Sequence, residues 1–154
     1  GGVMMVTMPA DAQDKMTRQL SGGQDAMMKI ELVDVRMPKP NGAKMLKSKI
    51  EIHGLATAKE KYKKLQNNNP KGYTFREGDM NNLGYQLMSE GHHEAAIYVF
   101  TLNHKNNPTS WNACDSLADG YRAAGNHAKA KECYEKALKI NPDFTAAKNK
   151  LARL

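Results

Sequence analysis

The stretch WNACDSLADGYRAAGNHAKAKECYEKALKINP, residues 111–142, decides the fold of this chain. Its apolar residues recur at helical spacings on both sides of Gly125-Asn126, as expected for two buried helix faces. Glycine ends helices readily in the left-handed region, and proline cannot continue a helix interior. The stretch therefore predicts two antiparallel helices joined at Gly125. Their apolar stripes are Leu117, Ala118 and Tyr121, then Ala130, Tyr134, Ala137 and Leu138.

The same unit occurs once before, shifted by 34 residues. The aligned pairs include Leu83 with Leu117, Gly91 with Gly125, Phe100 with Tyr134 and Pro108 with Pro142. A period of 34 with small, aromatic and proline residues at these places is typical of tetratricopeptide repeats. The chain resembles tetratricopeptide-repeat proteins. This resemblance implies an all-α fold, a right-handed superhelix of about 2.5–3 helix pairs closed by a C-terminal capping helix.

Working outward, we expect a tetratricopeptide domain over residues 41–154. Its parts are a degenerate repeat at 41–70, repeats at 77–108 and 111–142, and a capping helix at 143–154. In the degenerate repeat, Gly54 marks the turn and Lys47 replaces the usual small residue. The segment KGYTFREG predicts a longer connection before the second repeat. We expect Asp143 to cap the last helix, with Ala147, Leu151 and Leu154 covering the open end and the lysines facing water.

Residues 1–40 give a weaker pattern. Residues 10–20 are compatible with a short helix, and residues 27–37 alternate like a strand that has no partner. We therefore expect an extended or mobile arm. The first residues have no basic leader, so no signal peptide is expected. The lack of an initiating Met suggests a trimmed chain or a fragment, and the compartment is not readable from this end.

The net charge of +7 comes from the first half of the chain. Residues 1–76 hold 14 Lys and Arg against 7 Asp and Glu, whereas residues 77–154 hold 9 of each. Two interpretations are open for the lysines between 44 and 64: a patch for nucleic acid or anionic lipid, or the solvated face of amphipathic helices. We favour the solvated face, because no recognised nucleic-acid-binding module accompanies these lysines.

No catalytic or metal site is expected. Asp115 and Asp119 project from one helix face, but on a repeat groove we expect them to form a solvated acidic lining. His92-His93-Glu94 lies at a turn and lacks further ligands for a tetrahedral metal site. Cys114 and Cys133 are expected to be free thiols that fill space. The sequence predicts no cofactor, no enzyme activity and, since it has no long apolar run, no transmembrane helix.

The segment NNLGYQLMSEGHHEAAIYVF and its continuation to residue 142 resemble a more specific module, found at the C-terminus of bacterial β-lactamase-like or α/β-hydrolase esterases. The match covers roughly residues 41–154, but neither a G-x-S-x-G elbow nor an S-x-x-K motif is present. This resemblance implies an accessory module for stability or dimerisation, in a periplasmic or secreted enzyme. A cytoplasmic location is equally compatible with the sequence.

A groove for a partner is the main functional prediction. In stacked helix pairs the first helix of each repeat lines the concave side. The predicted peptide-binding residues are Asn81, Asn82 and Tyr85 in the second repeat and Asn112, Asp115, Asp119 and Arg122 in the third. Their amides can pair with a peptide backbone. The alternative is that the groove is too short to bind a ligand, or is covered by residues 1–40.

The family's best-known ligand mode, in co-chaperones, clamps the C-terminal carboxylate of a heat-shock chaperone with Lys, Arg and Asn. Asn82 matches the asparagine of that clamp, but Asp115 and Asp119 stand where the basic pair is required. Each would repel such a ligand by about 1 kcal/mol or more. The resemblance therefore favours a neutral or basic protein or peptide partner over an acidic one or nucleic acid.

Overall fold

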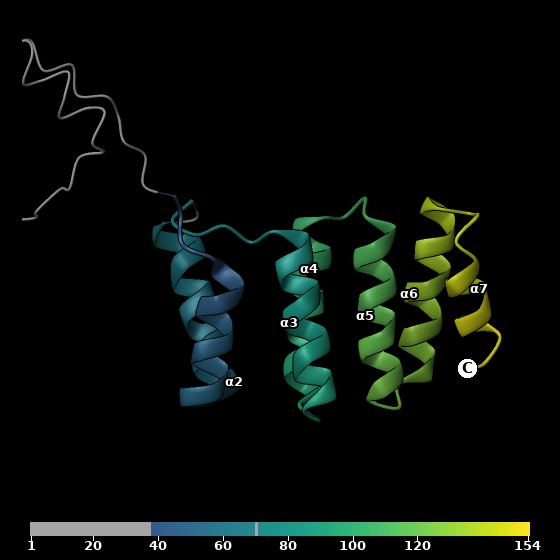
Figure 1. The fold of residues 1–154 in the computed structure, drawn as a ribbon, viewed down its shortest axis with the longest axis horizontal. Coiled ribbons are helices and arrows are strands. Elements are labelled where there is room, and N and C mark those ends of the chain that lie inside the picture. Colours follow the sequence, from purple (N-terminus) through teal and green to yellow (C-terminus); the bar gives the residue numbers. More distant parts are fainter. Residues whose placement is uncertain (1–37, 70) are drawn as a thin grey trace, which may run out of the picture. The chain divides into compact units, whose positions relative to one another are not determined.

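The computed structural model describes residues 38–69 and 71–154. These residues form only helices and connections, so the predicted all-α helical repeat is confirmed (Figure 1). The predicted short helix and strand within residues 1–37 lie outside the described residues. The helices are α2 (Gly42–Asn68), α3 (Glu77–Ser89), α4 (His93–Asn106), α5 (Trp111–Ala123), α6 (His127–Ile140) and α7 (Thr145–Leu151).

Helices α3 and α4 form one hairpin, and α5 and α6 form the next. Each hairpin turns at a glycine in the left-handed region, Gly91 with φ 80° and Gly125 with φ 75°. At the second turn, the backbone N–H of Gly125 donates to Arg122 O at 3.0 Å and that of Asn126 donates to Tyr121 O at 2.9 Å. This pair of bonds is a Schellman motif, which satisfies the last carbonyls of a helix. The first turn has the same two bonds.

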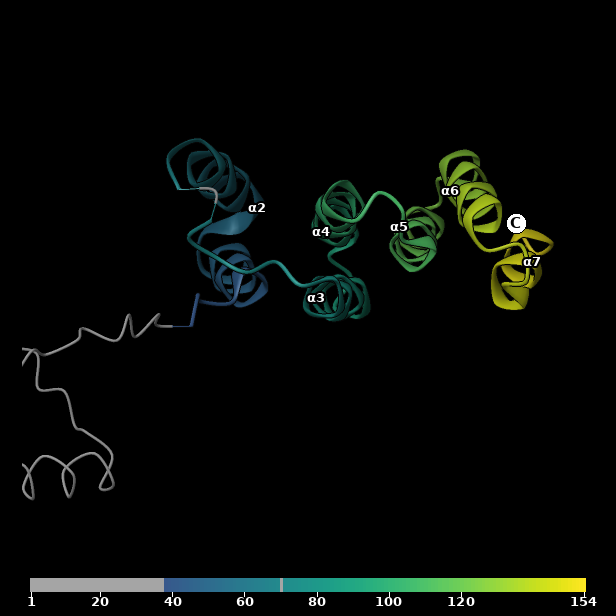
Figure 2. The same ribbon diagram turned by 90° about the horizontal axis from the view of Figure 1, so that it is seen from above.

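Helix α2 is itself a pair of helical arms. Gly54, with φ 80° and ψ 167°, interrupts it and reverses the chain, and the two arms lie side by side in both views (Figures 1 and 2). Leu46 from the first arm and Ala58 and Tyr62 from the second are buried. The sequence expectation of a turn at Gly54 therefore matches the backbone.

The helices form two layers. The first arm of α2, α3, α5 and α7 lie on one side, and the second arm, α4 and α6 lie on the other (Figure 2). Phe100 of α4 is fully buried between the layers. A Cβ atom added to Gly84 of α3 would stand 2.3 Å from its ring, and one added to Gly120 of α5 would stand 2.9 Å from it. The glycines thus let α3 and α5 approach α4 closely.

The connection between α2 and α3 is ordered against α2. The N–H of Gly42 donates to Thr74 O at 2.7 Å, and that of Thr74 donates to Pro40 O at 3.0 Å. The ring of Phe75 packs edge-on against Tyr62, with centroids 5.3 Å apart. The connection is therefore held against both arms of α2, by backbone hydrogen bonds at Gly42 and by the aromatic contact at Tyr62.

Helix α7 closes the other end, in a way the sequence predicted only in part. Ala147 is buried and Leu151 and Leu154 pack against the core, as expected. Asp143 does not cap the helix, because the N-cap is Phe144 and no side chain bonds there. The aromatic ring of Phe144 instead lies 4.4 Å from that of Trp111, centroid to centroid. No helix within the described residues is long and apolar enough to cross a membrane.

Candidate functional site

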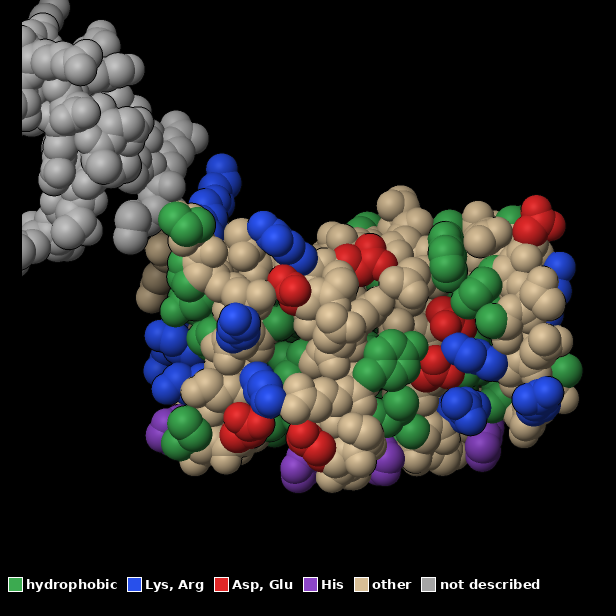
Figure 3. Space-filling model, viewed as in Figure 1, with side chains coloured by type: hydrophobic (Ala, Val, Ile, Leu, Met, Phe, Trp, Pro, Cys, Tyr) green, Lys and Arg blue, Asp and Glu red, His purple; other side chains and the backbone are tan. Residues whose placement is uncertain are grey.

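The side formed by α3, α5 and α7, here called the α3/α5/α7 face, carries most of the predicted groove residues. Helix α5 lies set back between α3 and α7 (Figure 2). The space-filling view, seen from the same side as Figure 1, shows acidic and basic side chains close together on the right of this face and further charged side chains over α2 on the left (Figure 3). This face is where sequence reasoning placed a partner.

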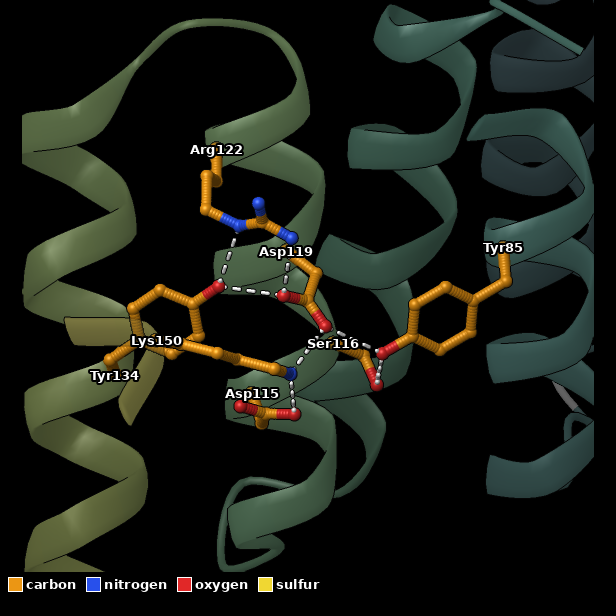
Figure 4. A network of polar contacts seen from close by, with 7 residues as sticks. All are labelled: Tyr85, Asp115, Ser116, Asp119, Arg122, Tyr134 and Lys150. Atoms are coloured by element: carbon orange, nitrogen blue, oxygen red, sulfur yellow. Dashed lines mark hydrogen bonds and ion pairs between the residues drawn. The ribbon is translucent and has the colours of Figure 1, made fainter. Parts of the chain in front are cut away.

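An ion-pair network lies at the centre of this face (Figure 4). Lys150 Nζ of α7 donates to Asp115 Oδ2 at 2.8 Å and to Asp119 Oδ2 at 2.7 Å. Asp115 and Asp119 are each only 5% exposed. The interpretation of the two carboxylates as a solvated lining is therefore wrong, and so is the expectation that Lys150 faces water.

Two tyrosines complete the coordination of Asp119. The hydroxyl of Tyr134 donates to Oδ1 at 2.6 Å, and the hydroxyl of Tyr85 donates to Oδ2 at 3.0 Å while lying 3.2 Å from Ser116 Oγ. Arg122 approaches Oδ1 at 3.5 Å. The network thus joins α3, α5, α6 and α7 (Figure 4).

The two carboxylates differ in their pKa. Burial raises the pKa of Asp115, and its bond to Lys150 only partly offsets this. Burial also acts to raise the pKa of Asp119, but hydrogen bonds from Lys150 and Tyr134 outweigh it and leave that pKa lowered. Burial acts to lower the pKa of Lys150, and its bonds to both carboxylates raise it overall. The lysine therefore stays charged at neutral pH.

The other predicted groove residues are divided between interior and surface. Asn81 is 7% exposed and accepts from Asn103 Nδ2 at 2.7 Å, so it packs inside the α3–α4 hairpin. Asn112 donates to Glu77 Oε1 at 3.0 Å, which ties α5 to α3. Asn82 is exposed on α3, and the side chain of Arg122 is 49% exposed.

A hollow of about 270 Å³ lies beside Asn82, between α2 and α3. Amide, basic and acidic side chains line it together with two apolar ones. The lining residues are Asn41, Ala43, Lys44, Lys47, Asp79, Asn82, Leu83 and Gln86. The walls of the hollow therefore offer both hydrogen-bond donors and hydrogen-bond acceptors.

Sequence reasoning missed Lys150, Ser116 and Gln86. The 34-residue period could have found the first two, since Asn82, Ser116 and Lys150 are one period apart. They occupy equivalent positions on α3, α5 and α7. Continuing the period into the capping helix would have placed a lysine beside the two aspartates. Gln86 follows Asn82 by one helical turn.

The two cysteines lie in the interior of the helix stack. Cys114 and Cys133 are free and buried, and burial raises the pKa of both thiols. Cys114 Sγ lies 3.4 Å from His104 Nδ1, but burial lowers the pKa of that histidine. Within residues 38–69 and 71–154, no group of three His, Cys, Asp or Glu side chains is placed to hold a metal ion.

Comparison with known proteins supports the repeat. Residues 111–144 match the tetratricopeptide repeat family model, so the chain carries a tetratricopeptide repeat over α5 and α6. No curated protein matches, and the resemblance to hydrolase-attached modules remains a prediction.

Two solved structures are among those with a similar fold. Naa15/Naa10 bound to HypK-THB aligns with a TM-score of 0.48 at 19% identity, over 72% of this chain and 16% of that one. MamA AMB-1 aligns with a TM-score of 0.46 at 14% identity, over 72% of this chain and 58% of that one. The chain thus spans less than two thirds of either protein.

Proposed function

We propose that this chain is a non-catalytic protein-interaction module that binds an extended peptide on the α3/α5/α7 face. The observation that carries the proposal is the hollow between α2 and α3, where Asn82 is exposed. Gln86 lies one turn further along the same helix and is also exposed. Two amides at this spacing can each donate to and accept from a peptide backbone without requiring a particular sequence.

The charges near the hollow favour a neutral or basic peptide. Lys44 and Lys47 line it, but Asp79 lies opposite, and Lys47 pairs with Glu51 at 3.5 Å. Further along the face, the carboxylates of α5 already hold an ammonium group. A peptide that crosses this face therefore meets charges of both signs at the hollow. It then meets the two carboxylates of α5, which bind a cation.

A displayed library of random peptides tests the proposal. We expect the full chain to enrich peptides, and Asn82→Ala/Gln86→Ala to weaken their binding about tenfold, because each lost amide contributes about 0.5–1.5 kcal/mol. Gln66→Ala/Asn106→Ala is the matched control. It removes the same two side-chain types from exposed positions on the second arm of α2 and on α4.

The control variant should bind the enriched peptides like the wild type. Kd is measured by fluorescence polarisation with labelled peptide. Equal losses in both double variants, or no enrichment over a control surface, would contradict a peptide site on this face. The latter result would favour a purely structural appendage.

A further inference from the structure

We propose that Asp115 and Asp119 form a binding site for the ammonium group of a partner's lysine, and that the chain's own Lys150 fills this site in the absence of that partner. The inference rests on the proposed peptide-binding function and names one side chain that the peptide should carry. It assigns a new role to Lys150, as an exchangeable occupant of the site.

The first observation is the quality of the site around the ammonium group. Both carboxylates are 5% exposed, both bind Nζ at 2.7–2.8 Å, and the Tyr134 ring centroid lies 5.7 Å from Nζ. Carboxylate oxygens and an aromatic face are the groups that bind primary ammonium ions. Tyr85 and Tyr134 fix Asp119 by their hydroxyl groups, so the site is held in place from α3 and α6.

The second observation is an unused acceptor. Asp115 Oδ1 is buried and has no hydrogen-bond partner among the described residues. A buried carboxylate oxygen without a partner is costly, so the acidic pair offers more acceptor capacity than Lys150 uses. The ion pair with Lys150 therefore leaves one carboxylate oxygen of the acidic pair unsatisfied.

The third observation concerns how Lys150 reaches the site. Its side chain is 29% exposed, whereas those of the aspartates are 7% exposed, so the ammonium enters from the solvent side of the face. Helix α7 is anchored separately, through Ala147 in the core and through Phe144 against Trp111. The long, flexible lysine stem can therefore swing out while α7 stays packed.

Exchange makes the site accessible from the proposed peptide path. Lys150 stands in the same repeat position on α7 as Asn82 does on α3, and Ser116 occupies that position between them on α5. A peptide that bonds with Asn82 and continues across α5 passes the aspartates. Its lysine can replace Lys150 with no change in the number of ion pairs.

Chemical rescue tests the site itself, independently of any peptide. In Lys150→Ala, n-butylammonium at about 10–50 mM should raise the thermal unfolding midpoint in a saturable way, as ligand linkage requires. Tetramethylammonium, which has no N–H donor, should have no such effect. Lys148→Ala, an exposed lysine on the same helix, is the matched control and should not respond to either ion.

Should Lys150→Ala fail to fold, Lys150→Ala/Asp115→Asn removes one of the two unpaired charges, and it should still respond to n-butylammonium through Asp119. The triple variant that also carries Asp119→Asn should not respond. The ammonium site is overturned if both ions raise the thermal unfolding midpoint equally, or if n-butylammonium raises it in no folded variant.

Peptides then test the exchange. For a lysine-containing peptide enriched by the wild type, replacement of its lysine by norleucine should weaken binding to Lys150→Ala by about tenfold or more. The loss in the wild type should be smaller, because Lys150 competes there. Equal losses in both proteins overturn the exchange. Rescue by n-butylammonium without any peptide binding would instead mean that the proposed peptide function fails while the ammonium site stands.

Discussion

At the residue scale, Asp115 and Asp119 show how neighbours decide the role of identical side chains. Asp119 receives hydrogen bonds from Lys150, Tyr134 and Tyr85, whereas Asp115 receives one from Lys150 and keeps one oxygen unpaired. The environment therefore favours the charged form of Asp119 and disfavours that of Asp115. The opposite pKa shifts of the two residues express this difference.

We expect Asp119→Asn to destabilise the fold by about 2–4 kcal/mol at pH 7, because it leaves Lys150 with one weaker partner. A lowered folded-state pKa gives stability that is present above the ordinary value of about 3.9 and lost as pH falls through the folded value. The difference from wild type should thus shrink at low pH. Asp115 has a raised pKa, so its ionisation costs stability as pH rises above its ordinary value.

Asp115→Asn should therefore be the milder substitution at pH 7. The free energy of unfolding of this variant should rise relative to that of the wild type between pH 3 and pH 7. Urea unfolding of both variants at pH 3, 5 and 7 measures this. Identical pH profiles for the two variants would show that the network does not distinguish the two carboxylates.

Gly84 offers a second test at the residue scale. A Cβ there would stand 2.3 Å from the Phe100 ring. The ring also packs closely against Gly120 of α5, so it has little room to move away. We expect Gly84→Ala to destabilise by about 1–3 kcal/mol through overpacking. Gly78→Ala on the same helix is the control, since a Cβ there meets nothing within 4 Å. It should stabilise by up to about 1 kcal/mol, as measured by urea unfolding.

At the element scale, the hairpins depend on glycines in the left-handed region. Gly125 has φ 75° and open space around its missing Cβ, so any cost of substitution is due to the backbone alone. Gly125→Ala should destabilise by about 1–2 kcal/mol, and Gly125→Asn by less, because asparagine tolerates this region better. Equal effects on the free energy of unfolding would contradict this explanation.

The same glycines explain why the elements were predictable. Helix ends at Gly91 and Gly125 follow from local chemistry, and burial of Leu83, Leu117 and Ala118 follows from spacing. The burial of Asn81, Asp115 and Asp119 depends instead on partners 15 to 35 residues away in the sequence. A polar residue on a helix face looks solvated until the group that satisfies it is known.

At the scale of the whole molecule, the stack has a well-packed middle and lightly packed ends. The fully buried residues Leu87, Phe100 and Tyr134 belong to α3, α4 and α6, respectively. The second arm of α2 buries only Ala58 and Tyr62, and α7 buries only Ala147. In a linear array each unit contacts only its neighbours, so stability is local.

Each end has one aromatic contact that anchors it: Phe75 against Tyr62 for α2, and Phe144 against Trp111 for α7. We expect Phe75→Ala to speed amide hydrogen exchange in α2 and to leave α5 and α6 slow. Phe144→Ala should speed exchange in α7 and leave α2 unchanged. Each variant is the control for the other, and mass spectrometry of peptic fragments resolves the helices. If either substitution accelerated amide hydrogen exchange equally in all described helices, the stack would be one cooperative unit. Displacement of Lys150 at one end would then disturb the peptide hollow at the other.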